Sequence, residues 1–211
     1  SPSEGGYALS RCVDETIVTK PAIRKQMLAR RRQMSGEEAR RRSQAVFQNF
    51  LSVFNPERHR TVHLFLSIVK FQELDTSPII AFLSEKHPDV KVGVPRVDFA
   101  AKTLLHHEYD EAALAENSWG IREPLESAPA LKPEEFDLVL VPMLAFDRQC
   151  HRVGYGGGYY DKFLAQVRKD CHKFGLCYQF GLLEANLSPE NFDVAVDCVI
   201  TDERLYGSSS V

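Results

Sequence analysis

The sequence lacks the long apolar runs and the charge excess that mark several classes of protein. No stretch of its 211 residues approaches the ~18 apolar residues that a membrane-spanning helix needs. The formal net charge is only −3, so we expect neither nucleic acid nor a membrane surface as a partner. The first ten residues have no basic start and no apolar core, which argues against a signal peptide. With 44% hydrophobic residues, the chain can form one globular domain with a sizeable core.

Cysteine is scarce, and its spacing predicts neither a disulfide framework nor a zinc site. The number is odd, and no pair has Cys-x-x-Cys spacing: Cys12, Cys150, Cys171, Cys177 and Cys198. We therefore expect reduced thiols in a cytoplasmic protein. His106 and His107 are adjacent, so on a strand they point to opposite faces and cannot share a metal ion.

The pattern along the chain predicts a single three-layer α/β domain around a mostly parallel sheet, preceded by N-terminal helices. We expect residues 1–18 to be an irregular leader, in part an expression remnant, residues 19–205 to be the domain, and residues 206–211 to be a tail. Thr19 and Pro21 start a predicted helix that ends near residue 34, and the capping-box spacing from Ser35 to Glu38 starts a second that ends near residue 54. Strands are predicted at 61–66, 90–95, 102–108, 137–142, 172–180 and 197–201, and further helices at 76–86 and 158–168.

The segment from Arg152 to Asp161 has four glycines in five residues, between a predicted strand and a predicted helix. Each glycine raises the entropy cost of ordering the loop, so this many require a reason. A turn whose backbone N–H groups converge on an anion provides one, and ligands of open sheets bind beyond the carboxyl ends of strands, where this loop lies. No Gly-Lys-Ser/Thr follows, and Tyr159 stands where a dinucleotide fingerprint has its third glycine. The residues alone therefore predict a phosphate-binding loop, with a nucleotide as the expected ligand.

Two segments together resemble the signature of the 5-formyltetrahydrofolate cyclo-ligase family: 142–147 (PMLAFD) and 152–161 (RVGYGGGYYD). The resemblance extends over about residues 20–202. Further similar segments follow in the family's order: Lys20-x-x-x-Arg24, Leu66-Ser67, 73–76 (ELDT), 94–96 (VPR), 119–124 (WGIREP) and 193–197 (DVAVD). This resemblance implies the NagB-like fold of ribose-phosphate isomerases and CoA transferases. It also implies a ligase that uses ATP and magnesium to convert 5-formyltetrahydrofolate, with or without a polyglutamate tail, into 5,10-methenyltetrahydrofolate, acting as a monomer.

The resemblance also implies roles for individual residues. The implied ATP-binding residues are Lys20, Arg24, Arg152, Gly154, Tyr155, Gly156, Gly157, Gly158, Tyr159 and Tyr160. The implied substrate-binding residues are Leu66, Glu73, Trp119, Tyr155, Gly156, Tyr159 and Tyr160. Arg152, Tyr159 and Asp161 are the implied catalytic residues, and Asp161 and Asp193 are the implied magnesium ligands.

The chain departs from the family pattern at three places. Cys150 stands where the family usually has glycine, two residues are inserted between Ser67 and Glu73, and the stretch before Lys20 is longer than usual. The first departure can alter the turn before Arg152, and the second can reshape the loop of the folate pocket.

Each implied role has a plainer alternative at this stage. The glycines can form a flexible surface loop, Lys20 and Arg24 can belong to a solvated helix face, and Asp161 can cap its own helix. Glu73 and Asp193 can be surface carboxylates, and the aromatic residues can be core. For the whole chain the alternatives are another enzyme on a related fold, such as a sugar-phosphate isomerase or CoA transferase, a non-catalytic folate or nucleotide binder, or an RNA-binding module that uses the basic run 20–42.

Overall fold

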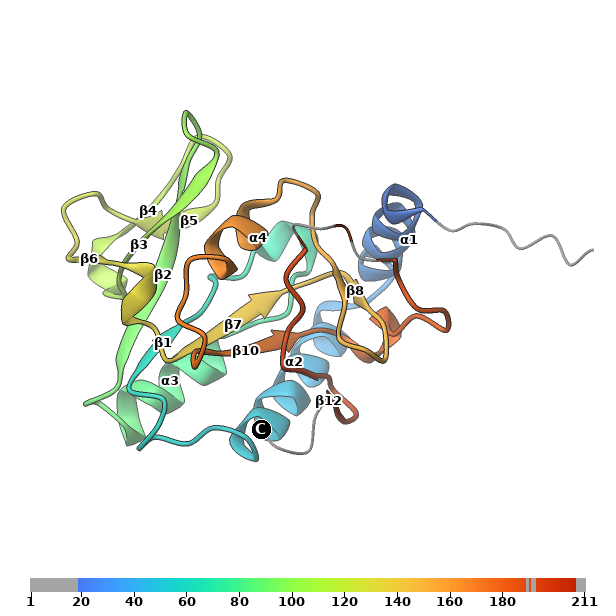
Figure 1. Ribbon diagram of the computed structural model, residues 1–211, viewed down its shortest axis with the longest axis horizontal. Coiled ribbons are helices and arrows are strands. Elements are labelled where there is room, and N and C mark those ends of the chain that lie inside the picture. Colours follow the sequence, from blue (N-terminus) through green and yellow to red (C-terminus); the bar gives the residue numbers. More distant parts are fainter. Residues whose placement is uncertain (1–18, 189, 191–192, 208–211) are drawn as a thin grey trace, which may run out of the picture.

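A computed structural model describes residues 19–188, 190 and 193–207; the predicted leader lies outside the described residues. Its centre is a twisted sheet with helices on both sides (Figure 1). The helices are α1 (Lys20–Arg32), α2 (Gly36–Leu51), α3 (Ser77–Lys86) and α4 (Tyr159–Leu164), with 3-10 turns η1 (Val69–Phe71), η2 (Glu111–Ala113), η3 (Pro133–Glu135) and η4 (Gln179–Gly181). The strands are β1 (Thr61–His63), β2 (Lys91–Asp98), β3 (Thr103–Glu108), β4 (Leu114–Glu116), β5 (Arg122–Pro124), β6 (Ala130–Leu131), β7 (Leu138–Pro142), β8 (Ala145–Phe146), β9 (Arg152–Val153), β10 (His172–Leu176), β11 (Cys198–Ile200) and β12 (Leu205–Gly207).

The main sheet has eight strands in the order β12-β11-β10-β7-β1-β2-β3-β6. Its five central strands, β11, β10, β7, β1 and β2, are parallel, whereas β12, β3 and β6 join antiparallel at the two edges. The prediction of an α/β domain with a mostly parallel sheet and N-terminal helices is thereby confirmed.

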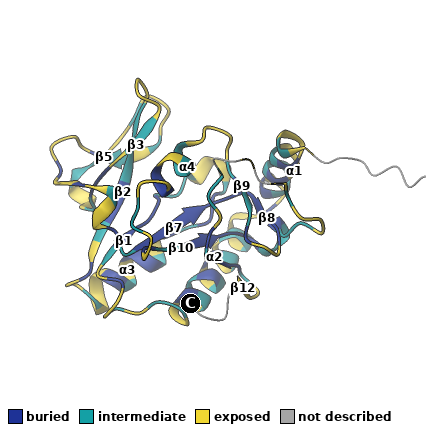
Figure 2. Ribbon diagram, in the orientation of Figure 1, coloured by how far each residue is buried: buried dark blue, intermediate teal, exposed yellow. Residues whose placement is uncertain are grey.

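The central strand β7 shows how the two faces of the sheet are covered. All five of its residues are buried (Figure 2), as expected for a parallel strand with layers on both sides. Leu138 and Leu140 pack into one core cluster with side chains of α2 and α3, whereas Val139 and Val141 pack into a second cluster with side chains of α4. Alternate residues of one strand therefore bind the two outer layers to the sheet.

The two N-terminal helices begin where their capping residues predict. The Thr19 hydroxyl accepts a hydrogen bond from the Ala22 amide at 3.4 Å, and the Ser35 hydroxyl accepts one from the Glu38 amide at 3.0 Å. Helix α1 packs against the β8–β9 hairpin rather than against the main sheet. Its residues Ile23 and Met27 belong to one hydrophobic cluster with Ala145 and Val153 of the hairpin. None of the helices in the described part of the chain has the length and apolarity that a membrane crossing requires.

Several predicted elements have different bounds. The strand predicted at 61–66 ends at His63, because the following chain leaves the sheet and is held by Thr76, whose hydroxyl donates to the Phe65 carbonyl at 2.6 Å. The strand predicted to end at Pro95 continues to Asp98, and the helix predicted at 158–168 ends at Leu164, with a turn after it. The strand predicted at 172–180 ends at Leu176, because the chain turns into η4 soon after it.

Pro95 is tolerated inside β2 because the missing N–H faces no partner strand. The pairing of β2 with β1 ends at Gly93, so only β3 continues beside it. The Val97 amide, two residues on and therefore on the same side of the strand as Pro95, donates to the Glu123 carboxylate at 3.2 Å. Proline is expected at such an edge position.

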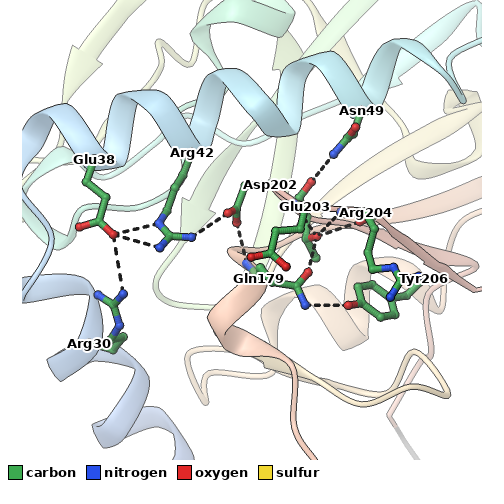
Figure 3. Close-up of polar contacts among 10 residues, drawn as sticks. Arg30, Glu38, Arg42, Asn49, Gln179, Asp202, Glu203, Arg204 and Tyr206 are labelled. Atoms are coloured by element: carbon green, nitrogen blue, oxygen red, sulfur yellow. Dashed lines mark hydrogen bonds and ion pairs between the residues drawn. The ribbon is translucent and has the colours of Figure 1, made fainter.

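A polar network joins α2 to the last turn of the chain (Figure 3). The Arg42 guanidinium donates to the Glu38 carboxylate within α2 and to the Asp202 carboxylate at 2.7 Å. The other Asp202 oxygen accepts a hydrogen bond from the backbone N–H of Gln179 at 2.6 Å, and the Asn49 side chain donates to the Thr201 carbonyl at 2.8 Å. Asp202 therefore links α2, η4 and the β11–β12 turn.

Candidate active site

The glycine-rich segment forms a tight loop between β9 and α4. Gly156 and Gly158 have φ angles of +97° and +71°, in the left-handed region that side chains other than glycine rarely adopt. A Cβ atom at Gly157 would lie 2.7 Å from the Tyr159 ring. The path of the loop therefore favours glycine at three consecutive positions.

The loop follows a short hairpin in which Cys150 occupies a strained position. Cys150 has φ +64° and is buried, with its amide donating to the Asp147 carbonyl at 3.0 Å. This is the left-handed conformation that explains a glycine preference here. The hairpin nevertheless closes, since β8 pairs with β9 and places Arg152 opposite Phe146.

One cavity of about 510 Å³ lies between α1, the glycine loop and the carboxyl ends of β1 and β7. Almost every predicted site residue lines it: Lys20, Arg24, Leu66, Glu73, Arg152, Gly154, Tyr155, Gly156, Gly157, Gly158, Tyr159, Tyr160, Asp161 and Asp193. The rest of the wall includes Phe65, Ile68, Pro95, Val97, Leu104 and Pro142. The topology thus brings together segments that are up to 173 residues apart in the chain.

Trp119 is the predicted residue that the structure places outside the cavity wall. Its side chain is 61% exposed, and its ring lies 4.8 Å from that of Phe99 in an edge-on arrangement. Its carbonyl accepts a hydrogen bond from the Lys70 ammonium at 2.8 Å, so the turn before β5 contacts η1. The substrate contact of Trp119 stays a prediction.

Two ion pairs line part of the cavity. The Lys20 ammonium pairs with the Asp193 carboxylate at 2.7 Å, and the Arg152 guanidinium pairs with Asp161 at 2.5 Å. Arg24 donates from Nε to the Gly154 carbonyl at 2.9 Å and covers Gly156. Helix α1 therefore contacts the glycine loop through Arg24 and Asp193 through Lys20, and neither side chain is part of a merely solvated helix face.

The two carboxylates form a donor set that suits a magnesium–nucleotide complex. Asp161 and Asp193 both face the cavity, and Lys20 with Arg152 lowers the pKa of Asp193 against the opposing effect of its burial, which is the largest single influence. No group of three or more His, Cys, Asp or Glu side chains in the described segments could hold a metal alone. Magnesium typically binds one or two carboxylates and takes its other ligands from phosphates and water, so the residues present fit it.

Helix α4 adds little to anion binding here. It has only six residues and begins after Gly158, with no side-chain cap. Its short length makes its dipole small, so the attraction for an anion comes from the loop amides and the cations.

Glu73, which also lines the cavity, is buried. Its side chain accepts the Ile68 amide at 3.1 Å and the Tyr155 hydroxyl at 2.6 Å. Burial raises the pKa of Glu73, and it also raises the pKa of Tyr160 beside it. Glu73 is therefore not a surface carboxylate, and nearby Leu66 and Tyr160 give this part of the cavity apolar walls.

Sequence reasoning missed Arg31, whose guanidinium donates to the Tyr155 hydroxyl at 2.6 Å. Arg31 is only 2% exposed, although it lies in the basic run 20–42. Its spacing contained the signal: Ile23, Met27 and Arg31 follow each other at four-residue intervals and share the buried face of α1.

Comparisons with known proteins point to one family. A model of the family described as "5-formyltetrahydrofolate cyclo-ligase family" matches residues 16–202. A 5-formyltetrahydrofolate cyclo-ligase of Haemophilus influenzae is 29% identical over 175 residues, which cover 82% of this chain and 91% of that protein. The Escherichia coli protein of the same name is 27% identical over 84% of this chain and 97% of its own length.

A solved structure shows the same fold. The structure of 5,10-methenyltetrahydrofolate synthetase from Aquifex aeolicus matches with a TM-score of 0.75 and 30% identity, over 89% of this chain and 92% of that one. The family match spans most of the chain, and with it the glycine loop, both carboxylates and Glu73. The chain belongs to the 5-formyltetrahydrofolate cyclo-ligase family, a family of ligases of folate one-carbon metabolism.

Proposed function

We propose that this chain converts 5-formyltetrahydrofolate and ATP into 5,10-methenyltetrahydrofolate, ADP and phosphate, with magnesium. The observation that carries the proposal is that one cavity is lined by two chemically different groups of residues. The glycine loop with its cations and the buried Glu73 carboxylate both line it. A phosphate donor and a heterocyclic acceptor can therefore meet in one enclosed space.

The chemistry requires activation of the formyl oxygen. An N-formyl group is a resonance-stabilised amide with a poorly electrophilic carbon. Transfer of the γ-phosphoryl group from ATP to the formyl oxygen breaks the bond to ADP and leaves an iminium-like carbon at N5. N10 then attacks this carbon, its proton is lost, and phosphate departs with the former formyl oxygen as the methenyl bridge forms.

Phosphoryl transfer depends on positioning and charge neutralisation rather than on a protein nucleophile. Gly154, Gly156, Gly157 and Gly158 offer backbone N–H groups to the phosphates, and Arg152 offsets their charge. Lys20 and Arg24 hold the nucleotide from α1, with Tyr155, Tyr159 and Tyr160 as walls. In this proposal Arg152, Tyr159 and Asp161 surround the reacting γ-phosphate.

Asp161 and Asp193 would hold the magnesium ion, which supplies further charge neutralisation at the phosphates when bound. Each carboxylate is paired with a cation, so binding of the nucleotide must redistribute both pairs. An unchanged magnesium response in Asp161→Asn would remove Asp161 from this role.

Folate recognition is assigned to Glu73 and the residues around it. A carboxylate can accept two adjacent N–H groups from the pterin ring, and Leu66 with Tyr160 packs against the ring. Trp119 retains a predicted contact with the substrate. We further propose that the chain acts as a monomer in the cytoplasm. The four buried free thiols among the described residues support that compartment, because thiols stay reduced there.

The test is formation of methenyltetrahydrofolate absorbance from 5-formyltetrahydrofolate, with and without ATP and magnesium. Turnover that needs all three is expected, and its absence in folded protein with every ligand present would exclude the proposed activity. Binding of a sugar phosphate or acyl-CoA without folate binding would instead favour an isomerase or transferase on a related fold. Salt-dependent RNA binding that ATP does not change would favour the RNA-binding module.

A further inference from the structure

Three side chains form a buried chain of hydrogen bonds beside the cavity. Arg31 donates from Nη1 to the Tyr155 hydroxyl, and that hydroxyl donates to Glu73 Oε2, both at 2.6 Å. Arg31 also donates from Nη2 to the Met143 carbonyl at 3.0 Å. The Tyr155 hydroxyl therefore accepts from Arg31 and donates its one proton to Glu73. This fixes the donor-to-acceptor direction of the two hydrogen bonds.

A further set of contacts joins the segment before Glu73 to the end of α1. The Gln72 side-chain amide donates to the carbonyls of Arg31 at 3.1 Å and Met34 at 2.6 Å, and the Gln72 carbonyl accepts the Tyr178 hydroxyl at 2.9 Å. Gln72 has φ +49°, a left-handed conformation with a cost for any residue other than glycine. The residue before Glu73 is thus held against the end of α1 in spite of this strain.

Arg31 opposes the effect of burial on Glu73. Burial favours the neutral carboxylic acid, whereas the charge of Arg31 and the hydrogen bonds from Tyr155 and the Ile68 amide favour the carboxylate. The other titratable groups that face Glu73 are the phenols of Tyr160 on α4 and Tyr178 after β10. Within the described segments, Arg31 is the cation whose charge acts on Glu73.

We propose that Arg31 is a positioning residue for folate recognition, which acts through Tyr155 to hold Glu73 as an oriented carboxylate in the wall of the cavity. This inference rests on the proposed function, since it concerns how Glu73 meets the pterin ring. An ionised carboxylate accepts both N–H groups of the ring edge. A protonated carboxylic acid carries a hydrogen on one oxygen. That oxygen then presents a donor to one of the two ring N–H groups, which is also a donor.

The cost of burying Arg31 supports a role beyond helix packing. Ile23 and Met27 on the same face of α1 show that apolar side chains serve for packing there. A buried charge often stabilises a fold less than an apolar side chain of similar size would. Through Tyr155, Arg31 is linked both to the glycine loop and to the Glu73 carboxylate. This link accounts for a charged side chain at a buried position of α1.

The test compares Arg31→Met and Tyr155→Phe with Arg32→Met, an exposed neighbour on the same helix. Both test variants should raise the KM and Kd for 5-formyltetrahydrofolate roughly 10- to 100-fold, the size of a lost hydrogen bond to a charged group. The KM for ATP should change less than about threefold, because the loop backbone is retained, and Arg32→Met should match the wild type. Arg31→Lys keeps the charge and should recover part of the loss. Tyr155→Phe removes one oxygen atom and keeps the test open if Arg31→Met folds poorly.

A second readout needs no substrate. Infrared difference spectra against Glu73→Gln report the protonation of Glu73, which should occur roughly one to three pH units higher in Arg31→Met than in the wild type. An unshifted titration overturns the inference, even with a raised KM, because lost packing alone would explain that rise. A shifted titration with unchanged folate affinity also overturns it. If the wild type binds no 5-formyltetrahydrofolate, the proposed function fails, and the infrared titration still decides whether Arg31 sets the charge of Glu73.

Discussion

At the scale of single residues, the glycine loop depends on backbone conformations that only glycine adopts easily. Gly156 combines φ +97° with close approach to α1, since a Cβ there would lie 3.2 Å from Arg24 Cζ. We expect Gly156→Val to lower kcat/KM for ATP by more than about 100-fold, because both the loop amides and Arg24 would shift. Steady-state kinetics with varied ATP measures this effect.

The control is Gly154→Ala in the same loop. A Cβ at Gly154 would meet only Arg152 Nη1, at 3.5 Å, an ordinary contact. This variant should keep most of the activity, and both variants should show native circular dichroism. A fully active Gly156→Val would mean that the loop is not the phosphate-binding element.

Cys150 shows the energetic consequence of a residue other than glycine in a left-handed turn. Alanine at this position keeps the backbone strain and loses the sulfur, whereas glycine relieves the strain and leaves a similar gap in the core. We therefore expect Cys150→Gly to be more stable than Cys150→Ala by about 1 kcal/mol, after allowance for the greater freedom of glycine in the unfolded chain. Urea unfolding of both variants measures the difference. Equal stability would show that the turn relaxes around the alanine side chain.

At the scale of elements, α2 is held in place by the network around Asp202 (Figure 3). The Asp202 side chain is only 6% exposed and accepts hydrogen bonds from Arg42 and from the Gln179 amide. Asp202→Asn removes the charge that pairs with Arg42 and replaces one acceptor by a donor. We expect a loss of about 1.5–3 kcal/mol in the free energy of unfolding, measured by urea denaturation. Glu203→Gln, at the exposed neighbouring position, is the control and should change stability by less than about 0.5 kcal/mol.

Elements with local signals were predictable from the sequence. The caps Thr19 and Ser35 fix the starts of α1 and α2 through contacts within four residues, and the apolar run of β7 identifies the centre of the sheet. The ends of β1 and β2 were not predictable, because they depend on which strand lies alongside. A proline such as Pro95 ends a strand only where a neighbouring strand would need the N–H that proline lacks. The residues around Pro95 do not indicate whether such a strand lies alongside.

The site was predictable only in part, for the same reason. The glycines, Lys20 and Arg24 carry short motifs, so their presence at one cavity follows from the family resemblance. Arg31 carries no motif, and its burial results from contacts with Tyr155 and Met143, which lie more than 100 residues away. The one sequence feature that indicated its burial is its four-residue spacing from Met27 on the apolar face of α1.

At the scale of the whole molecule, two histidine pairs connect distant parts of the fold. His63 on β1 contacts His106 on β3 at 3.0 Å, and His59 before β1 contacts His172 on β10 at 2.9 Å. Burial, with a smaller effect of His172, lowers the pKa of His59 to about 4. Burial likewise lowers the pKa of His106 to about 4, holds that of His63 well below its usual value, and lowers that of His172.

These lowered values make stability depend on pH. In the unfolded chain the histidines bind protons near pH 6.5, whereas in the folded chain His59 and His106 do so only near pH 4. Between these values the unfolded state holds more protons, so the free energy of unfolding falls as pH falls, and it is fully retained above about pH 7. Each of the two histidines can account for about 3 kcal/mol of this loss at most, because each pKa unit corresponds to about 1.4 kcal/mol.

Urea midpoints measured between about pH 7.5 and 4.5 should therefore decrease steadily below about pH 6.5. His106→Gln keeps a hydrogen-bonding group beside His63 but cannot bind the proton, so it should make this decrease shallower even if it lowers stability at neutral pH. A slope that is the same in His106→Gln and in the wild type would mean that other groups cause the acid sensitivity. A flat wild-type profile down to pH 5 would mean that the buried pairs open and bind protons without unfolding, since a proton taken up equally by both states leaves stability unchanged.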